Sequence, residues 1–215
     1  PATGHTPPTL AGKEGDDNFA VSKAASGVTE LPGYDPAEAM ALLEEGLAEV
    51  GKTTEELATD VTIVGGDSDT WTTILQFLQN QWKENLGVDL VIEQLSFGQR
   101  LDRYNTGTYQ ITYGGWGGDY NDPLTFMDMW VTGGGNNDTK WSNADYDAYI
   151  ETAVTGMGDE RIEAMAQAEG LIAEHLPVYP LYWPSRNFVQ KSYVNDVARY
   201  PVGADIDFKW ATSDK

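Results

Sequence analysis

Apolar residues recur at helical spacing in the first third of the chain. Between residues 36 and 50 they are separated by three, four and three positions, on Met40, Leu43, Leu47 and Val50. This stripe predicts an amphipathic helix, because such positions share one helical face. Asp35 is suited to the N-cap, Pro36 to the first helical position and Gly51 to the C-terminal end.

The next stretch predicts a strand, a helix and a second strand. Thr53 and Glu56 have capping-box spacing, which predicts a short helical turn before a strand at 61–64. The helix that follows has one apolar face, made of Trp71, Ile74, Leu75, Leu78 and Trp82. Residues 88–92 form the second predicted strand. Such a βαβ unit implies parallel pairing and a right-handed crossover.

Further short elements complete an α/β pattern. Helices are expected at 97–104, 123–130, 144–154 and 161–175. Strands are expected at 109–115, 178–183, 187–189 and 207–211. The first of these strands runs into a glycine-rich bend. We therefore expect an α/β fold with a mixed sheet flanked by helices.

Residues 1–33 show no sustained hydrophobic period. They mix Pro, Gly, Ser, Thr and charged residues, which predicts an extended entry segment that depends on the rest of the protein. The chain begins PATGHTPPTL, without Met, a signal peptide or a lipidation motif. We interpret it as a piece cut from a longer protein.

Composition excludes several classes of function. The 215 residues include 34 acidic and 13 basic side chains, a net charge of −21, so a broad basic surface for nucleic acid or anionic lipid is not expected. The absence of cysteine excludes thiol catalysis, thiolate zinc sites and disulfides. His5 and His175 are the only histidines, so no histidine-rich metal site is predicted, and no cofactor is expected. No apolar stretch is long enough to span a membrane.

Catalytic and calcium-binding templates do not match. Residues 66–70 lack the final Gly of a nucleophile elbow, and the GGWGGDY run at 114–120 lacks dinucleotide glycine spacing. Counted from Asp67 or Asp119, an EF-hand loop would lack its sixth-position Gly and its twelfth-position Glu. Paired carboxylates near aromatic residues leave a glycoside hydrolase as an alternative, but no pair is singled out by spacing.

The most unusual segment is 109–126, YQITYGGWGGDYNDPLTF. A predicted strand ends in glycines, which leave its backbone groups open, and a Trp and an Asp follow within four residues. An extended peptide could pair with such an edge, while its α-ammonium pairs with the carboxylate. The same residues are also compatible with a glycine-rich bend that has a core Trp and a helix-capping Asp.

This segment resembles a motif of the extracellular solute-binding proteins of family 5, the oligopeptide- and dipeptide-binding proteins of ABC importers. Other landmarks of that family occur in the same order. They are YDPAEAMALL at 34–43, WKENLGV at 82–88, WSNADYD at 141–147 and PVYPLY at 177–182. The resemblance covers almost the whole chain from Tyr34 and is much more specific than any single motif.

The resemblance implies a fragment of a two-lobed clamshell of the type II periplasmic-binding-protein class. Residues 34–182 would form the α/β domain of the second lobe, after the entry segment at 1–33. Residues 183–215 would return to the first lobe of the full-length protein. Because removing one lobe would expose apolar surface, we expect the isolated chain to pair with itself.

The resemblance also assigns a ligand site. Asp119 would pair with the α-ammonium of a peptide, beside Trp116. Backbone hydrogen bonds to the peptide are expected at Gly114, Gly115 and Gly117, and Tyr113 and Trp71 would border the cleft. The basic residues with which some members bind ligand carboxylates have no clear match, although Arg103 lies near.

The implied function is non-enzymatic. The protein would capture an extended peptide between two lobes and deliver it to ABC transporter permease subunits. It would act in the periplasm or at the extracellular face of the membrane, held there only by a lipid anchor upstream of this chain. The alternative within the family is an oligosaccharide-binding protein that uses Trp116, Trp71 and Tyr113 as stacking platforms.

Overall fold

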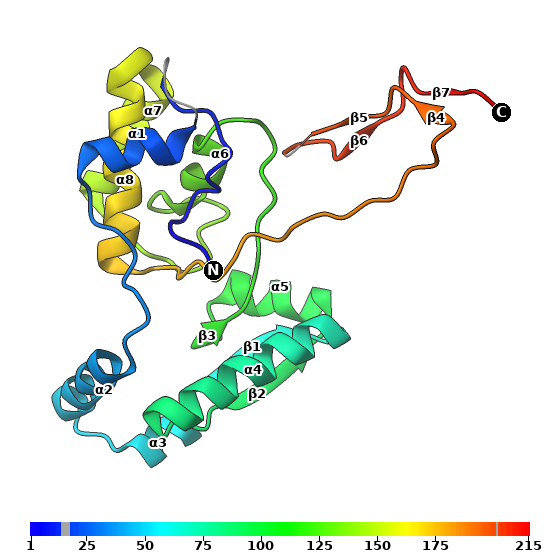
Figure 1. The fold of residues 1–215 in the computed structure, drawn as a ribbon. Coiled ribbons are helices and arrows are strands. Elements are labelled where there is room, and N and C mark those ends of the chain that lie inside the picture. Colours follow the sequence, from blue (N-terminus) through cyan, green and yellow to red (C-terminus); the bar gives the residue numbers. More distant parts are fainter. Residues whose placement is uncertain (14–17, 201) are drawn as a thin grey trace. The chain divides into compact units, whose positions relative to one another are not determined.

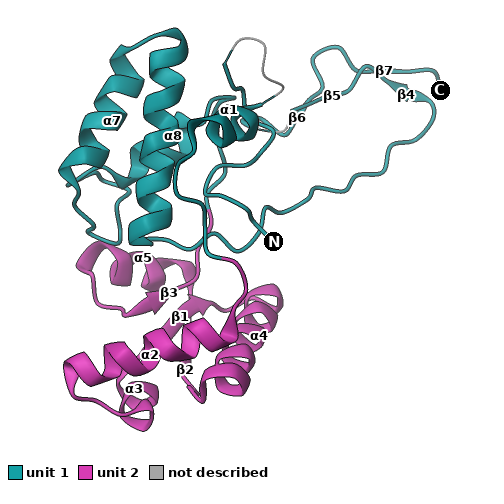
Figure 2. Ribbon diagram, turned by 60° about the vertical axis from the view of Figure 1, so that its left-hand side comes forward, with its two compact units in different colours: residues 1–32, 116–215 teal, residues 33–115 magenta. Residues whose placement is uncertain are grey.

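The computed structural model describes residues 1–13, 18–200 and 202–215 (Figure 1). The chain forms two compact units (Figure 2). Unit 1 comprises residues 1–32 and 116–215, and unit 2 comprises residues 33–115. The chain passes from unit 2 to unit 1 inside the glycine-rich segment, between Gly115 and Trp116.

Unit 2 contains the predicted βαβ arrangement, extended by one strand. Its elements are β1 (Thr62–Gly66), α4 (Asp69–Leu86), β2 (Val91–Leu95), α5 (Phe97–Thr106) and β3 (Ile111–Thr112). The strand order is β2-β1-β3 and both pairings are parallel, with Thr62 opposite Val91 and Ile63 opposite Ile111. The sheet is therefore parallel rather than mixed, because each connection crosses back through a helix.

The two helices before the sheet begin where the sequence predicts. In α2 (Pro36–Val50) the Asp35 carboxylate accepts hydrogen bonds from two backbone N–H groups, and Gly51 ends the helix with φ at 66°. In α3 (Thr54–Asp60) Thr53 and Glu56 form the predicted capping box. These contacts satisfy backbone donors that would otherwise lack partners at the helix ends.

Two strands of unit 2 differ from the prediction in length and position. Residues 88–90 precede β2 instead of forming its start, because the N–H of Val88 donates to the carbonyl of Trp82 in the C-terminal cap of α4. Strand β3 is shorter than the predicted 109–115. After it, the N–H of Tyr113 still donates to the carbonyl of Val64 at 3.0 Å.

Unit 1 is a helical body with a long C-terminal stretch. Its helices are α1 (Phe19–Ser26), α6 (Leu124–Met127), the 3-10 turn η1 (Asp128–Trp130), α7 (Ala144–Thr155) and α8 (Gly158–His175). Their apolar faces form the main core, around Phe19, Met127, Tyr146, Ile150, Met165 and Ile172. The buried Tyr146 hydroxyl donates to the carbonyl of Met127 at 2.7 Å, so the core contains no orphaned phenol there.

The sequence predicts that residues 1–33 are extended, but part of this segment is helical. Helix α1 lies within them, capped by Asn18 and ended by Gly27 with φ at 64°. Phe19 is buried in the main core, whereas Val21 is about half exposed. A helix of eight residues that buries two side chains has too short an apolar stripe to show a period in the sequence.

The C-terminal stretch pairs differently from the prediction. The strands expected at 178–183 and 187–189 are absent from the described residues, since these segments have no ladder partner there. Instead β4 (Val194–Asn195) pairs with β7 (Thr212–Ser213), and β5 (Ala198–Arg199) pairs with β6 (Ile206–Asp207), both antiparallel. The last predicted strand, 207–211, is thus replaced by two shorter ones.

The units differ from the domains expected from the sequence. A division falls at residues 32 and 33, close to the expected boundary, but the stretch 34–182 is divided again between residues 115 and 116. Its assignment to one lobe of a larger protein stays a prediction. None of the helices in the described ranges is long and apolar enough to cross a membrane.

Candidate ligand-binding site

The carboxyl ends of the unit 2 strands carry three side chains of different chemistry. Trp71 lies in the first turn of α4, which follows β1, and Arg100 lies in the first turn of α5, which follows β2. Tyr113 follows β3 directly. Because the strands are parallel, these positions share one edge of the sheet, where open α/β sheets bind their ligands.

Trp71 and Tyr113, both predicted to border the ligand, are in contact. Their ring centroids are 4.7 Å apart at an interplanar angle of 75°, an edge-to-face pair. The Arg100 guanidinium carbon lies 4.2 Å from the centroid of the Trp71 ring, so a cation covers one face of this indole. Trp71 is therefore a supported side chain rather than an open stacking platform.

Arg100 is part of a hydrogen-bond network centred on the Tyr104 hydroxyl. Its Nη1 donates to the Tyr104 hydroxyl at 3.2 Å. That hydroxyl also accepts from the Thr112 Oγ1 at 2.9 Å and lies 3.4 Å from the carbonyl oxygen of Tyr113. Thr112 belongs to β3, so the network ties α5 to the end of the sheet.

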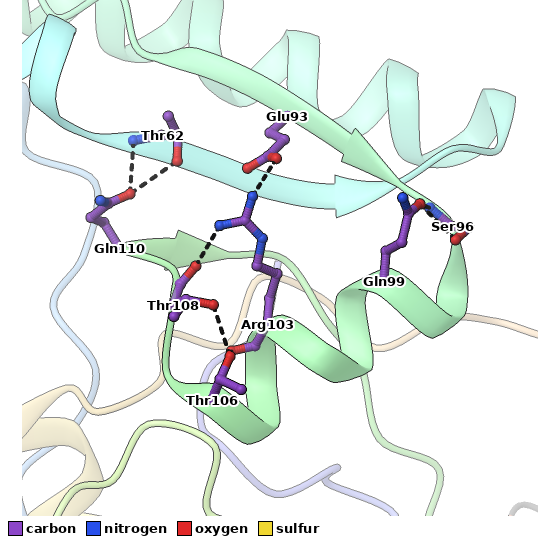
Figure 3. A network of polar contacts seen from close by, with 8 residues as sticks. All are labelled: Thr62, Glu93, Ser96, Gln99, Arg103, Thr106, Thr108 and Gln110. Carbon is purple, nitrogen blue, oxygen red and sulfur yellow. Dashed lines mark hydrogen bonds and ion pairs between the residues drawn. The ribbon is translucent and has the colours of Figure 1, made fainter.

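Arg103, noted from the sequence as a possible carboxylate ligand, is engaged inside unit 2 (Figure 3). Its Nη2 donates to Glu93 Oε1 at 2.6 Å, and its Nη1 donates to the carbonyl of Thr108 at 3.0 Å. Arg103 thus joins β2 to the loop before β3. The basic residue at the sheet edge is Arg100, which sequence reasoning missed. The position of Arg100 in the first helical turn after a predicted parallel strand could have indicated it.

The glycines at 114, 115 and 117 have open surroundings. A Cβ added at any of them would meet no described atom within 4 Å, and all three residues are exposed. The backbone at these three residues is therefore accessible. Gly118 differs, because a Cβ there would lie 2.9 Å from Cε2 of the buried Phe126.

Trp116 and Asp119 are positioned by the same residue of unit 1. The Trp116 Nε1 donates to the carbonyl of Thr125 at 2.9 Å, and the N–H of Asp119 donates to the Thr125 Oγ1 at 3.0 Å. Thr125 is buried in α6, so it fixes the turn that carries both predicted ligand residues. Trp116 keeps 43% of its surface exposed. No motif in the sequence singles out Thr125.

The Asp119 carboxylate is exposed. Among the described residues it accepts no hydrogen bond and forms no ion pair. Nearby, burial raises the pKa of the Asp128 carboxyl, a hydrogen bond from Tyr120 opposes this, and the charge of Asp119 raises the pKa further. Asp119 therefore offers an unpaired negative charge in a local negative field.

Asp122, three residues later, has a different role. Its carboxylate binds Arg161 of α8 through two hydrogen bonds of 2.8 and 2.9 Å, and Oδ1 also accepts from the N–H of Leu124 at 2.9 Å. Asp122 thus caps the start of α6 and anchors it to α8. Asp122 therefore uses its carboxylate within unit 1, whereas the carboxylate of Asp119 has no partner among the described residues.

The predicted site residues therefore belong to two sets. Gly114, Gly115, Tyr113 and Trp71 lie in unit 2, whereas Trp116, Gly117 and Asp119 lie in unit 1. The structure brings Trp71 and Tyr113 together, and it brings Trp116 and Asp119 together through Thr125. No group of three or more His, Asp or Glu side chains within the described ranges could hold a metal ion.

Relatives of known type match most of the chain. It is 31% identical to the oligopeptide-binding protein OppA of Bacillus subtilis over 203 residues, which is 92% of this chain and 35% of that protein. It is 32% identical over 139 residues to the dipeptide-binding protein DppE of the same species, covering 64% of this chain and 25% of the relative. The matched stretches thus span only a quarter to about a third of the length of these relatives.

Solved structures agree over the full length of the chain. The OppA of Listeria monocytogenes bound to peptide superposes with a TM-score of 0.82 at 26% identity, covering 100% of this chain and 40% of that one. The substrate-binding domain of an oligopeptide ABC transporter from Bacillus anthracis gives a TM-score of 0.81, also at 26% identity, covering 100% and 41%. The fold is therefore part of a periplasmic-binding-protein-like architecture.

Residues 1–138 match the family described as bacterial extracellular solute-binding proteins, family 5, in its middle part. This match covers more than half of the chain and includes all seven residues predicted to bind ligand. The chain belongs to the bacterial extracellular solute-binding proteins of family 5.

Proposed function

We propose that this chain is part of the substrate-binding component of an ABC importer that captures extended peptides. It would supply most of the second lobe of a two-lobed protein, and residues 183–215 would return to the first lobe. The relatives named for oligopeptide and dipeptide binding, and the OppA structure that contains peptide, support this ligand class. The closed protein would hand its peptide to permease subunits in the membrane.

The observation that carries the proposal is the unpaired carboxylate of Asp119. It is exposed on a turn that Thr125 and the Asp122–Arg161 pair hold in place. A rigid, unpaired carboxylate is suited to bind an α-ammonium group, because little freedom is lost on binding. The open backbone at Gly114, Gly115 and Gly117 would add hydrogen bonds that do not depend on peptide sequence.

The proposed process is binding and release without chemical change. The family consists of solute-binding transport proteins, and the site combines a carboxylate, an exposed indole and accessible backbone. We propose that the protein acts outside the cytoplasmic membrane, in the periplasm or lipid-anchored at the extracellular face. Its net charge of −21 would favour solubility near a membrane surface of the same sign.

The proposal is tested with Asp119→Ala in the complete two-lobed protein, by calorimetry with one peptide in free-amine and N-acetylated forms. We expect the variant to weaken binding of the free-amine peptide by about 10- to 100-fold, since a charge-assisted pair is lost. Binding of the acetylated peptide should hardly change. Asp145→Asn is the matched control, because it removes an exposed carboxylate from the first turn of α7 in the same unit.

Equal loss for both peptides would show that Asp119 does not recognise the ammonium group. Binding of oligosaccharides but of no peptide would instead support the oligosaccharide alternative. That alternative would depend on Trp116, because the guanidinium of Arg100 already covers one face of Trp71.

A further inference from the structure

Arg100 is a cation that forms no ion pair with any residue that the structure describes. Its guanidinium lies among three aromatic rings, 4.2 Å from the Trp71 centroid, 5.5 Å from that of Phe97 and 6.0 Å from that of Tyr104. Its side chain donates one hydrogen bond, from Nη1 to the Tyr104 hydroxyl. The Nε nitrogen is buried and has no acceptor among the described residues.

An arginine without an ion pair among the described residues is unusual in so acidic a chain. Three other arginines, Arg103, Arg161 and Arg186, form ion pairs with Glu93, Asp122 and Asp205. Arg199 donates to Gln190 and stacks on Phe188. Arg100 forms no ion pair with any described residue, although 34 acidic side chains are present in the sequence. A partly buried guanidinium with an unmatched donor calls for a partner that none of the described residues provides.

The position of Arg100 indicates where that partner would bind. Arg100, Trp71 and Tyr113 each follow one of the three parallel strands, at the edge of the sheet where ligands bind in such folds. The N-termini of α4 and α5 lie at the same edge, and their backbone N–H groups favour negative charge. Asp67 and Asp69 at the start of α4 are exposed and form no ion pair with Arg100.

We propose that Arg100 binds a carboxylate group of the ligand, with Trp71 and Tyr104 holding the guanidinium in position. The assignment rests on the proposed peptide-binding function. It makes Arg100, rather than Arg103, the residue that selects acidic or free-acid peptides over neutral ones. The carboxylate could be the peptide C-terminus or an acidic side chain, since both present the same two oxygens to a guanidinium.

The first test compares matched peptides on the complete two-lobed protein by calorimetry. Tetra-alanine is compared with its C-terminal amide, and the amide of Ala-Glu-Ala-Ala with that of Ala-Gln-Ala-Ala. We expect the carboxylate form of at least one pair to bind about 10- to 100-fold more tightly, the usual effect of a charge-assisted pair. The pair that shows the preference identifies the source of the carboxylate.

Arg100→Gln should abolish this preference and leave the neutral peptides with their original affinity. Arg103→Gln is the matched control, because it removes the same charge from the same helix but from the Glu93 pair. It should retain the preference. The proposal is overturned if the unmodified protein shows no preference, if Arg100→Gln keeps it, or if both variants lose it equally.

A second measurement separates this proposal from the proposed function. The Arg Nε–H signals of residues 1–215 are followed by NMR while N-acetylglycine is added, with N-acetylglycinamide as the neutral control. Arg100→Gln identifies the Arg100 signal by its disappearance. A saturable shift of that signal with the acid alone supports the carboxylate site even if no peptide binds, and absence of such a shift contradicts it.

Discussion

Trp71 and Trp116 are both tryptophans of the predicted site, but their rings have different surroundings and therefore different roles. The Trp71 ring is contacted by Arg100 on its face and by Tyr113 in an edge-to-face pair. The Trp116 indole is held by a single hydrogen bond to Thr125 and remains 43% exposed. Both were expected to border a ligand, but only Trp116 offers a free ring, whereas Trp71 supports a cation.

His5 is a second residue whose surroundings determine its behaviour. Its Nε2 lies 2.7 Å from the carbonyl oxygen of Phe126 and 2.9 Å from Nε1 of Trp130. Its backbone N–H donates to the buried carboxylate of Glu169, which also binds Lys23 at 2.9 Å. Burial lowers the pKa of His5 below 6.5 and outweighs the charge of Glu169, which acts in the opposite direction.

The lowered pKa of His5 predicts a loss of stability in mild acid. Below about pH 6.5 the unfolded chain takes up a proton at His5 that the folded chain does not, so stability present above that pH is lost as the pH falls. We expect the free energy of unfolding in urea to decrease from pH 7.5 to pH 5.5. The decrease should be smaller in His5→Gln, which cannot titrate.

His175→Gln is the control for loss of an imidazole elsewhere in unit 1, because His175 is exposed at the end of α8. If His5→Gln lost as much stability as the unmodified chain between the two pH values, another group would have to cause the effect.

At the scale of elements, the turn between β3 and α6 combines a rigid half and an open half. Its rigid half is held by Thr125, by the Asp122–Arg161 pair and by the close packing of Gly118 on Phe126. Its open half comprises the glycines up to 117, around which no described atom would contact an added Cβ. Rigidity next to open backbone is the arrangement expected of a preorganised binding segment.

Neighbouring glycines should therefore respond differently to the same substitution. Gly118→Ala should lower the free energy of unfolding by about 1–3 kcal/mol, because its methyl group would approach Phe126 and Thr125, both buried. Gly117→Ala should leave stability nearly unchanged but weaken peptide binding, since the methyl group would occupy space proposed for the ligand. Urea unfolding and calorimetry with one peptide measure the two effects.

An unaltered peptide affinity in Gly117→Ala would exclude close approach of the ligand backbone at this residue. Equal stability of the two variants would show that the turn relaxes around Gly118 without cost.

At the scale of the whole molecule, much apolar surface is exposed. Val189 is 97% exposed, and Phe208 and Trp210 are 66% and 68% exposed in the C-terminal stretch. In α2, which has no buried residue, Leu42 and Val50 are 62% and 65% exposed. Exposed apolar residues in this number are typical of surfaces that another protein part covers.

We therefore expect residues 1–215 on their own to self-associate. Light scattering at micromolar concentration should give a mass above that of one chain, and replacing Phe208 and Trp210 by Ser should lower it. In the complete two-lobed protein the first lobe would cover the C-terminal stretch, so that protein should remain monomeric. A monomeric mass for the unmodified chain 1–215 would contradict the prediction.

Local signals in the sequence predicted local structure well. The helix that Asp35 begins and Gly51 ends, and the capping box of Thr53 and Glu56, are confirmed because caps act over only a few residues. Strands were predicted less well. The extended segment 178–183 lacks a ladder partner among the described residues, and a strand needs a partner that no local pattern specifies.

The family landmarks in the sequence were sufficient to identify a solute-binding protein and to single out Trp116 and Asp119. Tertiary structure decided the state of each side chain. The order of the residues does not show that Asp122 binds Arg161 while Asp119 pairs with no described residue. Nor does it show that Arg103 pairs with Glu93 while Arg100 forms no ion pair within the described ranges. Motifs and caps depend on neighbours along the chain, whereas the availability of a charge depends on partners brought together only by folding.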